Sequence, residues 1–276
     1  MFYSNVLEYL MRDKTNPVNQ MYLHEIELMW KEVQKALAIS SQSGTNEDMV
    51  IAVNYFTEII SNQKYRYDKF KRKGFHYESQ LFQPYYIADL LSVIFSRTGV
   101  LEHYGIKWDF QRFDLGPKYS PPNLLEDEKK PNYTRYESNK FAMLTRTMEY
   151  QYRIEGRRNY EKSNQVYPLI VFGLFKRLDP IDFTQCESQA RLAREAFPGC
   201  KFIILTETLR ENYVPEVDKS DVDICFVLRK QYFNKRKKQN KIALDVVNVM
   251  EKTIIDYLNF YETPREDIFQ ARGILK

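Results

Sequence analysis

Apolar positions in the first third of the chain recur with the spacing of amphipathic helices. The pattern predicts a helix after Pro17, a second helix that begins at Thr45 or Asn46, and a third that begins at Pro84 and ends before Gly99. The three apolar stripes are Ile26, Met29, Trp30, Val33 and Leu37; Met49, Ala52, Val53, Phe56 and Ile60; and Ile87, Leu90, Leu91, Ile94 and Phe95. We therefore expect a helical N-terminal region over residues 1–80.

The rest of the chain alternates between strand and helix patterns. The expected strands are 148–154, 166–175, 201–207 and 222–229, and the expected helices are 184–196 and 242–258. The run 166–175 is almost continuously apolar, which is typical of a strand covered on both faces. Residues 105–135 are rich in proline, glycine and charge, and we expect them to form an exposed loop. The alternation predicts an α/β core over residues 81–276 that carries an inserted loop near 105–140.

The composition favours a globular protein with a substantial core. The chain has 276 residues, of which 43% are hydrophobic, and a formal net charge of +4. The three cysteines, Cys186, Cys200 and Cys225, are far apart and have no histidine nearby, so neither a zinc cluster nor a disulfide framework is expected. The sequence has no apolar stretch of the length that spans a membrane, and its first residues do not resemble a secretory signal. We expect a soluble cytoplasmic protein without a membrane partner.

Positive charge is concentrated in two segments. Residues 64–73, the first basic run, hold six cations and one acid, a local charge of +5 with aromatic residues interleaved. Residues 229–241, the second basic run, hold seven cations and no acid, a local charge of +7. Clustered lysine and arginine neutralise phosphates in nucleic-acid complexes. The runs also fit solvated surface segments, but two of them, one directly after a core strand, favour binding to DNA.

Two blocks of the sequence, residues 169–209 and 221–231, resemble the core of restriction endonucleases of the PD-(D/E)XK superfamily, and most closely the subunits of heterodimeric type IIT restriction enzymes. The resemblance is carried by the order of strand, Arg-rich helix and strand, and by the strand endings Thr206–Leu209 and Leu228–Gln231. The helix at 84–97 resembles the helix that precedes the catalytic sheet in these enzymes. The resemblance implies a mixed central sheet flanked by helices.

The resemblance also implies a metal-dependent nuclease centre, but the residues that it requires are missing. In the superfamily, an apolar strand carries a glutamate and a lysine two positions apart, on one face. The carboxylate helps to hold a divalent metal that activates water, and the lysine assists near the scissile phosphate. Here the aligned residues are Gly173 and Phe175, which cannot bind a metal or carry a proton. The usual upstream aspartate is also absent, because no Asp occurs between Asp127 and Asp179.

Nearby residues offer a substitute centre. Lys176 and Glu187 are the candidate catalytic residues, and Glu149, Glu155 and Glu187 are the candidate ligands of Mg²⁺, which such a centre would require. A strand residue shifted by one position points to the opposite face, so Lys176 serves only if a bulge intervenes. Glu187 has the better expected geometry, since some superfamily members place a carboxylate on the helix that follows the lysine strand.

Other polar residues of this region have structural interpretations beside the functional ones. Asp179 and Asp182 favour helix capping over metal binding. Glu207, at a strand end, fits a structural ion pair and a position near DNA equally well. Arg191 and Arg194 on the helix slightly favour contact with phosphate over solvation.

The sequence thus predicts a duplex DNA-binding protein with a type II restriction-endonuclease fold and a degenerate nuclease centre. It would act as a recognition or partner subunit, as a homodimer or as a heteromer with a related subunit. One alternative is an active Mg²⁺-dependent, site-specific endonuclease with a migrated carboxylate, and another is a protein-interaction module, which the basic runs disfavour. The residues expected to contact DNA are Lys64, Arg66, Lys69, Lys71, Arg72, Lys73, Arg191, Arg194, Arg229, Lys230, Lys235, Arg236, Lys237 and Lys238.

Overall fold

The N-terminal region consists of helices, as the apolar spacing predicts. The structure is a computed structural model that describes residues 2–12, 17–43, 45–70, 85–109, 113–118, 132–136, 141–152, 161–234 and 239–262. The helices are α1 (Phe2–Met11), α2 (Pro17–Ser43), α3 (Glu47–Phe70), α5 (Tyr85–Thr98) and α6 (Val100–His103). The three expected helices are confirmed as α2, α3 and α5, and Gly99 follows α5 with a φ of 67°. Helix α1 was not among the expected elements.

A buried carboxylate fixes α1 against α5. Asp89 is fully buried on α5, and its two carboxylate oxygens accept the backbone N–H groups of Phe2 at 2.6 Å and Tyr3 at 3.0 Å. These groups belong to the first turn of α1, which has no partner for them within the helix. Burial raises the pKa of Asp89 to about 6, although the two hydrogen bonds act to lower it. The start of the described chain is therefore tied to the helix that packs on the sheet.

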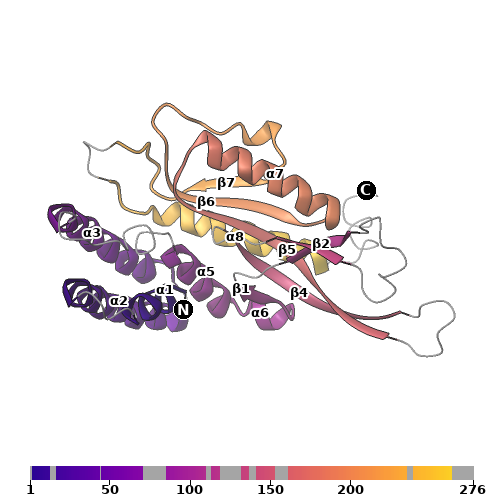
Figure 1. Ribbon diagram of the computed structural model, residues 1–276, viewed down its shortest axis with the longest axis horizontal. Coiled ribbons are helices and arrows are strands. Elements are labelled where there is room, and N and C mark those ends of the chain that lie inside the picture. The colour runs from indigo at the N-terminus through magenta and orange to yellow at the C-terminus, as the bar shows by residue number, and fades with distance from the viewer. Residues whose placement is uncertain are drawn as a thin grey trace.

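The centre of the molecule is a mixed sheet of five strands in the order β1-β4-β5-β6-β7 (Figure 1). Its strands are β1 (Lys107–Asp109), β4 (Phe141–Tyr152), β5 (Glu161–Leu178), β6 (Lys201–Leu209) and β7 (Ile224–Val227). The β1/β4 and β4/β5 pairs are antiparallel, whereas β5/β6 and β6/β7 are parallel. The expected mixed sheet flanked by helices is confirmed. The strand expected at 222–229 is shorter, because the chain turns after Val227.

The expectation of an exposed loop over 105–135 is wrong at three places. Strand β1 joins the main sheet there, and β2 (Phe113–Lys118) and β3 (Asn132–Tyr136) form a separate antiparallel pair. The register of this pair shifts between Asp114 and Pro117, at the Gly-Pro dipeptide that obscures a strand pattern in the sequence. The turn expected at 156–159 lies outside the described residues.

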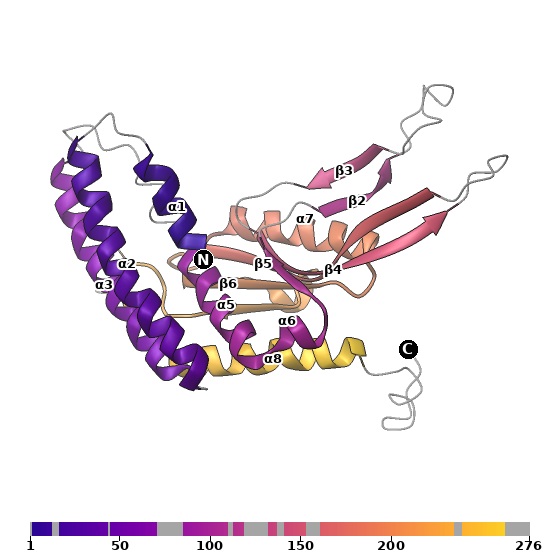
Figure 2. The same ribbon diagram turned by 90° about the horizontal axis from the view of Figure 1, so that it is seen from below.

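Alternate residues of β5 contribute to two hydrophobic cores, one on each face of the sheet. Val171 and Phe175 pack in the core beneath α7 (Pro180–Ala196), whereas Ile170, Phe172 and Leu174 belong to the other core. That second core continues through α5 and the N-terminal helices to α8 (Leu244–Glu262). Figure 1 shows α7 above the sheet and α8 below it, and Figure 2 shows α2 and α3 as a long pair at one end. The N-terminal helices thus share a core with the sheet.

A 3₁₀ turn, η2 (Val217–Lys219), lies in the connection between β6 and β7. Among the described helices, none has the length and apolar character needed to cross a membrane.

Candidate nucleic-acid interface

The two positions aligned with the nuclease motif lie in the core beneath α7. Phe175 is 4% exposed and belongs to the cluster that includes Phe141 and Cys186. A Cβ atom added at Gly173 would lie 3.0 Å from Cε2 of Phe175, and 3.3 Å from both Sγ of Cys186 and Cε1 of Phe141. The close approach of three side chains therefore favours glycine at this position, and hydrocarbon and sulfur lie in the space that a catalytic carboxylate would need.

The candidate upstream ligand Glu149 lies far from these positions along the hairpin. In the β4/β5 register, Glu149 pairs with Asn164, whereas Gly173 pairs with Phe141. Nine residues separate Asn164 from Gly173, which is about 30 Å along a strand. The other candidate on this hairpin, Glu155, lies outside the described residues.

Lys176 and Glu187 are on opposite sides of β5. The β5/β6 register shows no shift between Ile170 and Leu178, so Lys176 lies on the opposite face from Phe175. Glu187 is on α7, next to the buried Cys186, and α7 covers the face that carries Phe175. Among the residues that the structure describes, no three His, Cys, Asp or Glu side chains gather as metal ligands. The described parts of the expected centre do not come together and do not fit Mg²⁺.

The N-cap of α7 and two arginines of this helix have structural partners. Asp179 caps the helix, because its side chain accepts the backbone N–H of Asp182 at 3.0 Å, which confirms the capping interpretation for Asp179. Arg191 donates to Asp221 at 2.9 Å, and Arg194 lies 2.9 Å from a carboxylate oxygen of Asp223. Both arginines therefore connect α7 to the segment before β7. Contact of Arg191 and Arg194 with DNA stays a prediction.

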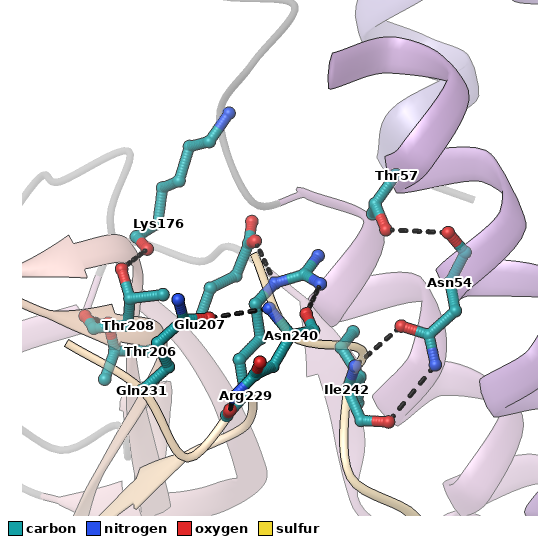
Figure 3. A network of polar contacts seen from close by, with 10 residues as sticks. All are labelled: Asn54, Thr57, Lys176, Thr206, Glu207, Thr208, Arg229, Gln231, Asn240 and Ile242. Carbon is teal, nitrogen blue, oxygen red and sulfur yellow. Dashed lines mark hydrogen bonds and ion pairs between the residues drawn. The ribbon is translucent and has the colours of Figure 1, made fainter. Parts of the chain in front are cut away.

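A buried ion pair lies where the second basic run begins (Figure 3). Nε of Arg229 donates to Glu207 at 2.7 Å, and the two side chains are 5% and 4% exposed. Arg229 therefore lies inside the protein, which differs from the surface contact with DNA expected for it. Of the two interpretations of Glu207, the structure shows the ion pair. The reason is tertiary, since β7 and β6 bring the two residues together across a parallel pair.

The hydroxyl of Tyr86 is buried beside this ion pair. Burial raises the pKa of Tyr86 well above its usual value, and the charge of Glu207 raises it further. Burial acts to lower the pKa of Arg229, but the neighbouring Tyr86 and Glu207 raise it overall. Arg229 is therefore a permanent cation and Tyr86 a neutral phenol. Since Tyr86 is on α5, this cluster joins the sheet to the helix below it.

Hydrogen bonds join residues 229–231 to Asn240, and we call these described residues the base of the second basic run. Asn240 accepts from the guanidinium of Arg229 with its carbonyl, and its amide donates to the carbonyl of Arg229 at 3.3 Å. The backbone N–H of Asn240 donates to Oε1 of Gln231 at 2.6 Å (Figure 3). Lys230 pairs with Asp245 at the start of α8. The described residues on the two sides of 235–238 are therefore held together, whereas Lys235, Arg236, Lys237 and Lys238 lie outside the described residues.

This anchored base is attached to α3, the helix in which the first basic run begins. Asn54 donates its amide to the carbonyl of Ile242 at 3.1 Å and accepts the N–H of Ile242 at 2.6 Å. Thr57 donates to the carbonyl of Asn54 at 3.1 Å. Lys64 follows Asn54 on the same helix by ten residues, which is about 15 Å along its axis. The ends of the two runs are therefore parts of one connected unit.

The outer part of the first basic run is not described. The side chains of Lys64, Arg66 and Lys69 on α3, and all of residues 71–73, lie outside the described part of the chain. Sequence reasoning missed Asn54, Gln231 and Asn240. The only signal for them was the presence of amide side chains beside a cationic segment, and an amide does not reveal its distant partner.

Comparison with known proteins identifies the architecture. No family profile and no curated protein matches the chain. The fold matches a chain of the native BbvCI A2B2 tetramer with a TM-score of 0.69, over 95% of this chain and 98% of that chain, at 13% sequence identity. The chain has a restriction-endonuclease-like fold. At this identity the likeness concerns the fold, and the A2B2 assembly is a property of BbvCI.

Proposed function

We propose that the chain is a duplex DNA-binding protein that acts as a recognition or partner subunit with a degenerate nuclease centre. The observation that carries the proposal is the packing around Gly173 and Phe175. Restoring a glutamate and a lysine there would force charged groups into a space where a single Cβ already meets neighbours at 3.0 to 3.3 Å. An uncompensated charge in such a site is costly. The motif positions of β5, Gly173 and Phe175, therefore supply neither the metal-binding carboxylate nor the lysine of the superfamily mechanism.

The arrangement of the basic runs supports DNA binding. The second run has seven cations and no acid, and its described residues on the two sides of 235–238 are joined by hydrogen bonds of Arg229, Gln231 and Asn240. The bond between Asn54 and Ile242 attaches this base to α3, on which the first run begins. A joined pair of cationic segments can follow the phosphates of a duplex, releasing counterions as it binds.

Binding to a labelled duplex, measured by fluorescence anisotropy over a series of salt concentrations, tests this part of the proposal. We expect the logarithm of the affinity to fall linearly with the logarithm of salt, with a slope of about −0.9 for each phosphate contact. The double change Lys235→Glu and Lys237→Glu should weaken binding to all sequences alike. Lys35→Glu is the matched control, because Lys35 is an exposed lysine of α2, outside both runs. Affinity that is undetectable at low salt, or that ignores salt, would contradict the proposal.

Incubation of supercoiled plasmid with the purified chain and Mg²⁺ tests the degenerate centre. We expect no nicking, since the metal-activated water of the superfamily mechanism requires carboxylates that the motif strand does not supply. DNA binding by the same preparation shows that the protein is folded and engaged. Mg²⁺-dependent cleavage that disappears in Glu187→Ala would instead establish the alternative, an active endonuclease with a migrated carboxylate.

The proposal includes a partner subunit. A single core presents one surface to the duplex, so recognition of a duplex site is expected to use two cores, in a homodimer or in a heteromer with a related subunit. The A2B2 arrangement of BbvCI supports this expectation. Analytical ultracentrifugation of the chain alone and with its genomic neighbour's product tests it, and a monomer in both samples would contradict it.

A further inference from the structure

We propose that Arg177 and Arg210, at the adjoining ends of β5 and β6, bind backbone phosphates of duplex DNA. This inference rests on the proposed function and names contact residues that lie outside both basic runs and outside α7. Both side chains are exposed. They lie at the carboxyl ends of the parallel strands β5 and β6, and together they are the proposed arginine surface.

Backbone hydrogen bonds bring the two arginines to the same edge of the sheet. The N–H of Arg210 donates to the carbonyl of Leu178 at 2.8 Å, and Arg210 follows by two positions Thr208, the residue that pairs with Arg177 in the β5/β6 register. The chain then returns to this edge, because the N–H of Phe233 donates to the carbonyl of Leu209 at 2.6 Å. Three segments distant in the sequence therefore meet at this edge.

Phe233 orients one of the guanidinium groups. The guanidinium carbon of Arg177 lies 5.1 Å from the centre of the Phe233 ring, a cation–π contact. Stacking on a ring restricts the guanidinium plane and leaves its N–H groups available at the edges. Phe233 is itself part of the second basic run, so Arg177 contacts a described residue of that run.

Charge pairing separates these two arginines from the others nearby. Arg191, Arg194 and Arg229 each pair with a carboxylate at 2.7 to 2.9 Å. Neither Arg177 nor Arg210 forms an ion pair with any residue that the structure describes. Their charges are therefore not neutralised by the described part of the protein, and they are available to an external anion.

The chemistry of the surface favours phosphates of a duplex. Guanidinium groups form paired hydrogen bonds with phosphate oxygens. The second basic run holds seven cations, and a run of this charge favours a ligand with many negative charges in a row over a single anion. Such phosphate contacts fix the orientation of a protein on DNA and do not read its sequence.

The test compares the full chain with Arg177→Ala, Arg210→Ala and Arg177→Lys, using a labelled duplex of arbitrary sequence and a salt titration. Arg12→Ala is the matched control, since Arg12 is also an exposed arginine but lies after α1, outside both basic runs and outside the residues expected to contact DNA. Arg177→Ala and Arg210→Ala should each lose about tenfold in affinity and reduce the salt slope by about 0.9. Arg177→Lys should keep the slope and lose part of the affinity, because lysine lacks the planar fork. Circular dichroism checks the fold of each variant.

The possible results separate the two proposals. If the unaltered chain binds duplex DNA while Arg177→Ala and Arg210→Ala behave like Arg12→Ala, the arginine surface is refuted and the proposed function stands. If the unaltered chain does not bind duplex DNA at low salt, both proposals fall. A loss of affinity and slope in Arg177→Ala and Arg210→Ala, with Arg12→Ala unchanged, supports the arginine surface.

Discussion

Adding a single methyl group at Gly173 tests whether the motif strand has become a packed core. Gly173→Ala would set a Cβ atom 3.0 Å from the ring of Phe175 and 3.3 Å from both Cys186 and Phe141. Such overpacking costs about 1–3 kcal/mol. Alanine also restricts the unfolded chain, which offsets about 0.4–1 kcal/mol. We therefore expect a net loss of about 1 kcal/mol in the free energy of unfolding.

A double-mutant cycle isolates the contact responsible. Phe175→Ala alone should cost about 3–5 kcal/mol, because it leaves a cavity beneath α7. In the double variant the ring that crowds position 173 is gone, so the total loss should be smaller than the sum by about 1 kcal/mol. Urea unfolding followed by circular dichroism measures all four proteins.

A second cycle supplies the control. Leu258→Ala removes a buried side chain of α8, which belongs to the core on the other face of the sheet. Its effect should add to that of Gly173→Ala within about 0.5 kcal/mol, as expected for independent sites. Strict additivity between Gly173→Ala and Phe175→Ala, or a stabilising Gly173→Ala, would refute the packing argument and reopen this strand as a functional site.

Three further predictions concern stability. The raised pKa of Asp89 means that the folded state holds its proton more tightly, so the free energy of unfolding should fall by about 3 kcal/mol as pH rises from about 4 to above 6; urea unfolding across this range should show that Asp89→Asn loses the slope. Glu207→Gln leaves the buried charge of Arg229 unpaired and should cost about 3–5 kcal/mol, measured by thermal unfolding. Asp179→Ala removes the acceptor for the N–H of Asp182 and should cost about 1 kcal/mol by chemical denaturation.

The order and type of the main elements could be predicted because they are encoded locally. The apolar stripe through Trp30 and the continuous apolar run around Val171 each report on a single helix or strand. The strands β1, β2 and β3 escaped prediction because they are short and because Gly116 and Pro117 interrupt one of them. Helix α1 also escaped prediction, and the Asp89 carboxylate that holds its first turn is 87 residues from Phe2.

The candidate site was less predictable, because its residues are defined by distant partners. Arg229 belongs to a basic run in the sequence, but Glu207, 22 residues away, pairs with it in the interior. Arg177 carries no local signal that distinguishes it from Arg191, whose partner Asp221 follows 30 residues later. The loss of the motif groups at Gly173 was visible in the sequence. The crowding that makes their return unfavourable was visible only in three dimensions.

The alternation of β5 between two cores limits how this protein can change over evolutionary time. A substitution of one hydrophobic residue for another at Val171 or Phe172 changes the packing on one face only, and the neighbouring side chains of that core can adjust to it. A one-residue insertion or deletion in 170–178 would instead turn every following side chain to the other face, exchanging the contents of both cores at once. The strand can therefore tolerate many hydrophobic substitutions, but it cannot tolerate an insertion or a deletion. Homologues should align across it without gaps, even where few residues remain identical.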